Sequence, residues 1–307
     1  MEDNMNTRDL DYFKKLVEKK NFTEVAEIFH VSQPTITQAI RRLEKEFDTK
    51  LITIDRVHQK NEITRTGKLL FEKSKRIQKD LALAHKEIQA AKCQKIRFGL
   101  PPIIGSLYFP QVVGKLAQAN ILDKLNMIES GSHSLLKQLQ DGDIDIAAIG
   151  SLLPINNPHL MAKHLGTRPF KLIVSKNHPL AKSSQPVDFR DLSEEKFIGF
   201  AGQFIHGQIM QDYIDHTGIK PEIIQRTPDI SWYKSLIRAN IGIGILVGDE
   251  INQYDHNIVS LDIKNPLPEN FNVSIFYRNG YVLKDDEQKL LEILEKMDIE
   301  HISKDHY

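Results

Sequence analysis

The chain has little cysteine and no long apolar run, and each lack excludes a class of protein. One cysteine, Cys93, occurs among 307 residues, so an intramolecular disulfide framework is excluded. Because no second cysteine could resolve an oxidised thiol, Cys93 is better interpreted as an incidental thiol than as a redox sensor. Eighteen consecutive apolar residues occur nowhere, and no apolar leader precedes Asn6, so we expect a cytoplasmic protein with no membrane segment.

The motifs of enzymes are missing as well. The 12 histidines form no HxH or HxxxH pair, which argues against a metal site. Gly242-Ile-Gly244 lacks the third glycine of a dinucleotide loop and lies in an apolar run. No serine, cysteine or acidic residue stands in a recognisable nucleophile setting. We therefore expect no enzymatic activity, no metal and no cofactor.

The net charge is zero, but the charges are distributed unevenly. Residues 1–92 contain 19 Lys and Arg against 15 Asp and Glu, whereas the remainder contains 22 against 26. The basic excess therefore lies at the N-terminal end, where a nucleic-acid partner would use it for phosphate contacts.

Two short helices separated by a tight turn are predicted between Thr23 and Glu44, after a first helix capped by Asn6 or Thr7. Ser32 can cap the last of these helices, with Pro34 in its first turn. Its apolar side chains share one face: Ile36, Ile40 and Leu43. The side chains left to face outward are Thr35, Thr37, Gln38, Arg41 and Arg42. This is the pattern of a helix-turn-helix that places polar side chains in the major groove of DNA. A purely structural three-helix bundle is the alternative.

A β-hairpin is predicted after these helices. Lys50–Ile54 alternates like a strand, residues 56–62 are polar and suit a hairpin tip, and Glu62–Thr64 can return as a second strand. In such a wing Arg56 would face phosphates together with His58 and Lys60, although a solvated loop is the simpler interpretation of any one of these charges.

Three segments carry a family resemblance: Val31–Glu44, Leu51 with the residues after it, and Ile63–Gly67. They resemble the winged helix-turn-helix of LysR-type transcriptional regulators, whose pattern runs Ser-Gln-Pro-Ala-x-Ser-x-x-Ile-x-x-Leu-Glu, then Leu-Phe-x-Arg, then Leu-Thr-x-Ala-Gly. Within that family the chain resembles regulators of malolactic or related organic-acid metabolism. The resemblance implies that the residues nearest the bases are Gln33, Pro34, Thr35, Thr37 and Gln38, and that Arg41 and Arg56 contact the DNA backbone. With Ser32 and Arg42 from the helix pattern, these residues form the predicted DNA-contacting set.

Two departures from the family pattern matter for recognition. Gln38 stands where the family often has Arg, so adenine rather than guanine is the expected base there. The wing segment Leu51–Arg56 is two residues longer than the family's Leu-Phe-x-Arg.

A long helix is predicted over residues 66–94, which contain one early glycine and no proline. Apolar and small side chains recur along it at alternating steps of four and three, which is a heptad seam. The seam either packs on its own domain or pairs with a second copy, and the family resemblance favours pairing into a dimer or tetramer. The expected dimerisation residues are Leu70, Ile77, Leu81, Ala84 and Ile88.

Strands and helices alternate from Lys95 onward, which predicts a mostly parallel α/β sheet. The landmarks Gly142–Ala147, His178–Ala181 and Gly242–Leu246 resemble the family's two-lobed effector domain, which has a periplasmic-binding-protein-like fold. The predicted organisation is an α-rich winged helix-turn-helix over residues 1–65, the linker helix over 66–94, and the effector domain over 95–307. Within that domain we expect lobe I at about 95–167 and 270–307 and lobe II at about 168–269.

Ligands of such sheets bind beyond the carboxyl ends of the strands, between the lobes. Several of these places precede helices, whose N-terminal N–H groups favour an anion such as a small carboxylate. For Ser130 and Ser132, N-capping of the next helix is an equally good interpretation. The expected effector-binding residues are Pro101, Pro102, Ile103, Ser106, Ser130, Ser132, Gly202, Gln203, Phe204, Ile230 and Ser231.

These observations predict a regulator that binds double-stranded DNA at an inverted repeat as a dimer or tetramer, with a small metabolite modulating that binding. The rival hypothesis is a cytoplasmic solute-binding or enzymatic α/β protein whose N-terminal helices only mediate assembly.

Overall fold

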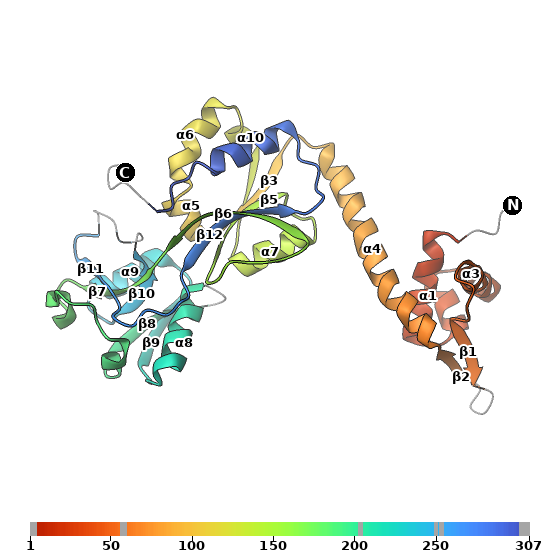
Figure 1. Cartoon of the computed structure of the whole chain (residues 1–307), viewed down its shortest axis with the longest axis horizontal. Helices are drawn as coiled ribbons and strands as arrows, with labels where there is room; N and C mark the ends of the chain where they lie inside the picture. The colour runs from red at the N-terminus through yellow and green to blue at the C-terminus, as the bar shows by residue number, and fades with distance from the viewer. Residues whose placement is uncertain (1–4, 56–59, 202–204, 249–250, 252–254, 301–307) are drawn as a thin grey trace. The chain divides into compact units, whose positions relative to one another are not determined.

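The computed structural model describes residues 5–55, 60–201, 205–248, 251 and 255–300. Its contacts divide the chain into two compact units, Met1–Lys92 and Cys93–Tyr307 (Figure 1). Within the described residues, no helix is both long enough and apolar enough to cross a membrane.

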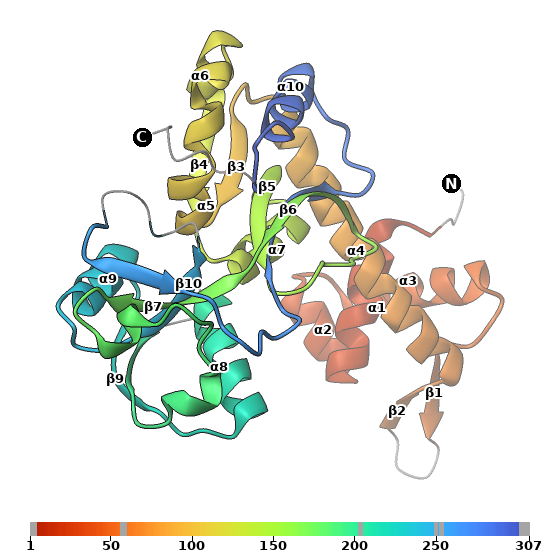
Figure 2. The same ribbon diagram turned by 60° about the vertical axis from the view of Figure 1, so that its left-hand side comes forward.

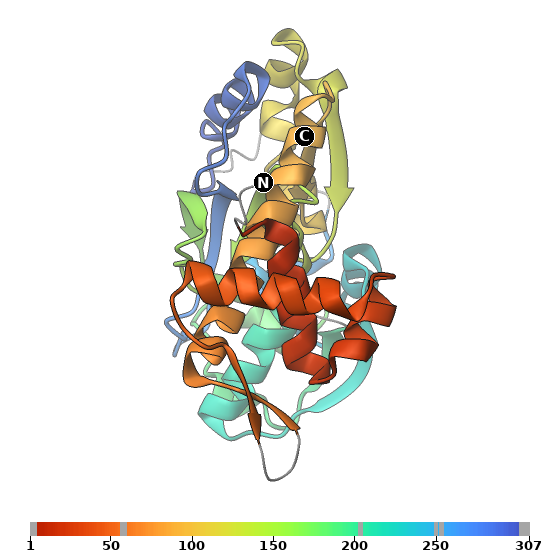
Figure 3. The ribbon, with the colours of Figure 1, turned by 90° about the vertical axis from the view of Figure 1, so that its right-hand side faces the viewer.

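The N-terminal unit consists of three short helices, a β-hairpin and one long helix (Figure 3, red and orange). Its elements are α1 (Thr7–Lys19), α2 (Phe22–Ile28), α3 (Gln33–Glu46), β1 (Ile52–Asp55), β2 (Lys60–Ile63) and α4 (Arg65–Ala91). The expected three helices and hairpin are therefore confirmed. The hairpin is antiparallel, with Ile52 opposite Ile63.

Side-chain caps set where these helices begin. Asn6 forms a reciprocal capping box with Asp9, because each residue's backbone N–H donates to the other's side chain, at 3.1 and 3.0 Å. Asn21 caps α2 by accepting from the N–H groups of Thr23 and Glu24, so α2 begins at Phe22 rather than at Thr23 as expected. Ser32 caps α3, as predicted.

The start of α4 belongs to the core of the N-terminal unit. Gly67 lies so close to Leu51 that a Cβ atom would come within 2.3 Å of the Leu51 carbonyl oxygen, which explains the glycine in this turn. Leu70 is buried in the core beside Leu51, so its assignment to a dimer face is wrong. The rest of the seam is exposed, with Ile77, Leu81 and Ile88 at 45%, 43% and 60%. These side chains, with Ala84, form the exposed seam of α4.

The C-terminal unit contains a five-stranded sheet in the order β4-β3-β5-β12-β6. Its strands are β3 (Ile96–Leu100), β4 (Leu125–Glu129), β5 (Ile146–Ser151), β6 (Leu160–Arg168) and β12 (Phe271–Arg278). The helices of this lobe are α5 (Pro102–Leu107), α6 (Pro110–Gln118), α7 (Ser132–Gln140) and α10 (Asp285–Leu294). The strand β6 was not predicted. The 3-10 turn η1 is Leu122–Lys124.

A second lobe lies below this sheet in Figure 2. Its strands are β7 (Phe170–Ser175), β8 (Lys196–Phe200), β9 (Glu222–Thr227), β10 (Gly244–Val247) and β11 (Ile258–Leu261). They form a β10-β7-β11 sheet and a β8-β9 pair. Its helices are α8 (Ile205–Thr217) and α9 (Ile230–Arg238), with the 3-10 turns η2 (Pro179–Lys182) and η3 (Phe189–Leu192).

The expectation of a mostly parallel sheet is wrong for this unit. The pairs β3-β4, β3-β5 and β8-β9 are parallel, but β12 is antiparallel to both β5 and β6, and β7 is antiparallel to both β10 and β11. The reason is connectivity, because the chain crosses to the second lobe after β6 and re-enters the first sheet in the reverse direction as β12.

Candidate nucleic-acid interface and effector pocket

One face of α3 is polar and exposed while the opposite face is buried. Ile36, Ala39 and Leu43 have no exposed surface. The amide Nε2 of Gln33 donates to the Thr37 hydroxyl at 2.9 Å, so two of the predicted DNA-contacting side chains hold each other in place. The predicted DNA-contacting residues on the exposed face differ in exposure. Those open to solvent are Ser32, Gln33, Pro34, Gln38 and Arg41, and the half-buried ones are Thr35 and Thr37.

Arg42 does not lie on this exposed face. Its guanidinium makes a two-pronged ion pair with Asp9, in which Nε and a terminal nitrogen donate to the two carboxylate oxygens at 2.9 and 2.6 Å. Asp9 is fully buried, so the pair joins α3 to α1 inside the unit. The prediction that Arg42 faces outward is therefore wrong, because helical spacing alone could not reveal the buried carboxylate that it neutralises.

Glu44, at the end of the family motif, holds the hairpin against α3. Its carboxylate accepts from the backbone N–H of Leu51 at 3.0 Å and from the Lys50 ammonium at 2.7 Å. Asn61 on β2 donates to the Lys20 carbonyl at the end of α1, at 3.0 Å. These contacts, which sequence reasoning missed, fix where the wing starts and returns. Arg56 lies outside the described residues.

A pocket opens in the C-terminal unit where the two lobes meet. It contains about 320 Å³ of space, part of it open solvent. Its lining comes from Pro101, Ile103, Gly131, Ser132, Ile205, His206 and Phe271. Pro101, Ile103 and Ser132 were among the predicted effector-binding residues, and the other four were not.

Four elements meet at this pocket by their ends. Pro101 follows β3, Ser132 begins α7, Ile205 begins α8 and Phe271 begins β12. The N-cap of α7 is Gly131, which has no side chain to satisfy the first N–H groups of the helix. The N-capping interpretation of Ser130 and Ser132 is therefore wrong, and the first turn of α7 presents N–H groups beside the Ser132 hydroxyl.

His206 contributes a ring to the far wall of the pocket. It is 2% exposed, and its ring packs against Phe170 and Phe200 with centroids 5.6 and 5.2 Å apart. His206 was not among the predicted effector-binding residues, although residues 202–204, just before it in the chain, were.

Among the residues that the structure describes, the other predicted effector residues do not line this pocket. Ser106 is exposed and its hydroxyl donates to the Ile103 carbonyl, while Ile230 packs against the core of the second lobe. Ser231 is exposed, and its carbonyl accepts from the Ser235 hydroxyl. Pro102 and Ser130 are half-buried without lining it. Gly202, Gln203 and Phe204 lie outside the described residues.

Comparison with known proteins assigns a family to both the N-terminal and the C-terminal unit of the chain. Residues 7–68 match the bacterial regulatory helix-turn-helix protein, lysR family, and residues 89–298 match the LysR substrate binding domain. The malolactic fermentation system transcriptional activator of Lactococcus lactis is 32% identical over 293 residues, covering 95% of this chain and 99% of that protein. The DNA-binding transcriptional dual regulator OxyR of Escherichia coli K12 is 26% identical, covering 94% and 95%.

The fold has solved counterparts over nearly its whole length. Full-length BenM aligns with a TM-score of 0.54 and 21% identity, covering 95% of this chain and 96% of that chain. HinK from Pseudomonas aeruginosa aligns with a TM-score of 0.54 and 20% identity, covering 95% and 98%. Because the substrate-binding-domain match alone spans more than half of the sequence, the chain belongs to the LysR family of DNA-binding transcriptional regulators, which are not enzymes.

Proposed function

We propose that this regulator binds an inverted-repeat operator as a dimer or a dimer of dimers, and that a small organic acid in the pocket modulates that binding. Two copies of α3 would enter successive major grooves about one helical turn apart, which is how dimeric helix-turn-helix proteins read a dyad. The exposed seam of α4 would join the two copies, since it places the large apolar side chains of Ile77, Leu81 and Ile88 in solvent.

The chemistry of the pocket supports an organic acid. Most of the lining side chains are apolar. The polar ones are Ser132, whose hydroxyl lies beside the N–H groups of the first turn of α7, and His206 on the opposite wall. A helix N-terminus favours negative charge, so a carboxylate would point here and its carbon skeleton would face Ile103, Ile205 and Phe271. The name of the malolactic relative suggests organic-acid metabolism as the setting.

The contact between Gln33 and Thr37 supports the DNA-contacting assignment. With one amide hydrogen committed to Thr37, Gln33 keeps its carbonyl oxygen and a second hydrogen for a base edge. That pair of groups matches the N6 and N7 positions of adenine.

Selection of genomic DNA fragments by the purified full-length protein tests the operator proposal. We expect a dyad-symmetric site, and we expect Gln33→Ala together with Arg41→Ala to abolish its enrichment while dimerisation persists. Unchanged enrichment in that double variant would contradict the assignment of α3. Failure of the native protein to enrich any sequence would favour the solute-binding rival.

Thermal shift with a panel of short-chain mono- and dicarboxylates tests the pocket. A bound acid should raise the unfolding temperature of the native protein, and Ser132→Trp should remove that shift. Ser134→Trp is the matched control, because Ser134 is exposed on the same helix and does not line the pocket. An equal shift in the native protein and in Ser132→Trp would mean that the ligand binds at a different site.

A further inference from the structure

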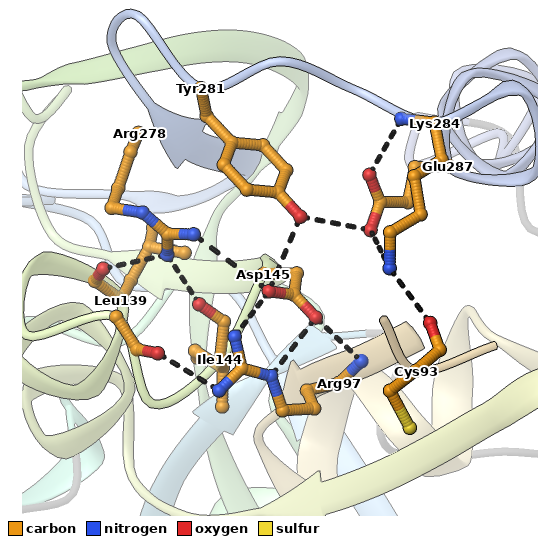
Figure 4. Close-up of polar contacts among 10 residues, drawn as sticks. Cys93, Arg97, Leu139, Ile144, Asp145, Arg278, Tyr281, Lys284 and Glu287 are labelled. Carbon is orange, nitrogen blue, oxygen red and sulfur yellow. Dashed lines mark hydrogen bonds and ion pairs between the residues drawn. The ribbon is translucent and has the colours of Figure 1, made fainter. Parts of the chain in front are cut away.

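Figure 4 shows a cluster of charged and polar side chains around Asp145, which directly precedes β5. The cluster lies at the end of the five-stranded sheet away from the pocket, because Arg97 is near the start of β3 and Pro101 follows the end of that strand. At its centre Asp145 is 1% exposed and accepts from the backbone N–H and Nε of Arg97 at 3.0 and 3.1 Å. The guanidinium of Arg278 lies 3.7 Å from the same carboxylate. Arg278 also donates to the Leu139 carbonyl near the C-terminal end of α7, and Arg97 donates to the carbonyl of Gly142, two residues beyond that helix.

The cluster continues to the first residue of the C-terminal unit. The Tyr281 hydroxyl donates to Glu287 at 3.0 Å and lies 3.4 Å from Asp145, so it bridges two buried carboxylates. Glu287 is fully buried and also accepts from the backbone N–H of Lys284 at 2.8 Å. The Lys284 ammonium lies 3.8 Å from Glu287 and donates to the carbonyl of Cys93 at 3.1 Å. Cys93 directly follows Lys92, the C-cap of α4.

Three elements run from the pocket to this cluster. Along β3, Arg97 lies in the cluster and Pro101 follows the strand at the pocket. The helix α7 begins at the pocket with Ser132, and its Leu139 carbonyl accepts from the cluster. Finally β12 begins at the pocket with Phe271 and ends in the cluster with Arg278. A ligand in the pocket would therefore contact the same three elements that hold Arg97, Asp145 and Arg278 together.

We propose that this cluster of Arg97, Asp145, Arg278, Tyr281, Lys284 and Glu287 couples occupancy of the pocket to the linker, through the bond from Lys284 to Cys93. The inference rests on the proposed function, because it assumes that the pocket is the regulated site. Charges in a low-dielectric interior interact strongly and lose much of that interaction when their geometry changes. A displacement of α7 or β12 therefore redistributes the bonds of Tyr281 and Glu287, and Lys284 passes the change to the residue after α4.

Buried ion pairs also serve stability alone, so the test needs a readout that a purely structural role would not move. Hydrogen exchange of the backbone amides in residues 93–98 of the full-length protein is such a readout. The probe is a side chain built into the pocket, Ser132→Trp, with Ser134→Trp as its control on the exposed face of α7. Ser132→Leu is a smaller filling substitution that replaces Trp if the larger side chain lowers the far-ultraviolet circular dichroism.

We expect filling the pocket to change the exchange rates of residues 93–98 by about fivefold, the lower end of the usual range for coupled sites. In the Lys284→Met background the change should disappear, and in the Lys289→Met background it should persist, because Lys289 is an exposed lysine on α10, the helix that Lys284 precedes. Tyr281→Phe, which removes only the bridging hydroxyl, should also abolish the change.

Persistence of the change in Lys284→Met, or its absence in both filled-pocket variants, would overturn the inference. The readout needs no operator, so a protein that fails to bind DNA while keeping this response would overturn the proposed function alone. If the protein binds its operator but the exchange rates of residues 93–98 do not change when the pocket is filled, only the coupling would be overturned.

Discussion

At the scale of residues, two neighbouring arginines on α3 have different environments and should behave differently. Arg42→Ala leaves the fully buried carboxylate of Asp9 without its ion-pair partner, so we expect a loss of about 3–5 kcal/mol in the free energy of unfolding. Arg41 is exposed, so Arg41→Ala should change that free energy by no more than about 0.5 kcal/mol and weaken operator binding instead. Urea unfolding of the full-length chain, followed by far-ultraviolet circular dichroism, measures both variants. Equal stability of the two would contradict the structural role of Arg42.

The preference for one DNA base over another should depend on a single residue of α3, Gln38. If Gln38 reads adenine, Gln38→Arg should transfer preference at that position to guanine, with about 1–3 kcal/mol of discrimination between the two bases. Competition binding with operators that differ at one base pair measures the change. Gln38→Ala is the control, because it should relax the preference without creating a new one. An unaltered preference in the Arg variant would remove Gln38 from the base-reading set.

The carboxyl of Asp212 should make stability depend on pH. Its pKa is raised above the ordinary value by burial, and then by repulsion from Glu269 and Asp215. The folded state therefore holds this proton more tightly than the unfolded state, so stability falls as pH rises through the ordinary pKa and stays lower above the raised one. Asp212→Asn should raise the Tm at pH 7 by about 1–2 °C. Below about pH 4 the difference should vanish. Asp123→Asn, at an exposed acid, is the control.

At the scale of elements, α4 combines a buried beginning with an apolar stripe in solvent. Leu70 and Ser74 pack into the N-terminal unit, whereas Leu81 is 43% exposed. Leu81→Lys should therefore dissociate the dimer without unfolding the chain, and Leu70→Lys should unfold the N-terminal unit. Sedimentation velocity separates these outcomes, with Ala82→Lys as an exposed control beside the seam. A dimer that survives Leu81→Lys would place the interface elsewhere.

The elements differ in how far the sequence predicted them, for physical reasons. Local signals, such as the Ser32 cap and the apolar face of α3, depend on neighbours within one turn and were correct. The partner of Arg42 is 33 residues away in the chain, and no local pattern contains it. The same holds for the antiparallel direction of β12, which depends on a return from the other lobe.

The pocket shows the same limit. Pro101 and Ser132 were predicted because they follow strands of the first lobe, where the rule for carboxyl ends of strands applies directly. His206 follows β8, and the rule pointed to the neighbouring residues 202–204 but not to His206 itself. Phe271 begins a strand, so the rule could not point to it. Ile230 and Ser231 begin a helix too, but one that packs into the second lobe rather than at the pocket.

At the scale of the whole molecule, a chain with no net charge should still bind DNA in a strongly salt-dependent way. The N-terminal 92 residues carry four more basic than acidic residues, and the rest carries the opposite excess. Counterion release depends on phosphates neutralised locally, with a slope of log K against log salt of about −0.9 per contact. Arg41→Ala and Lys289→Met remove one positive charge each, but only Arg41 lies on the predicted DNA face. A dimer has two copies of Arg41, so we expect Arg41→Ala to make the slope of log K against log salt less negative by about 1.8. Lys289→Met should leave that slope unchanged. Equal slopes for the two variants would mean that net charge, rather than contact at α3, governs the association.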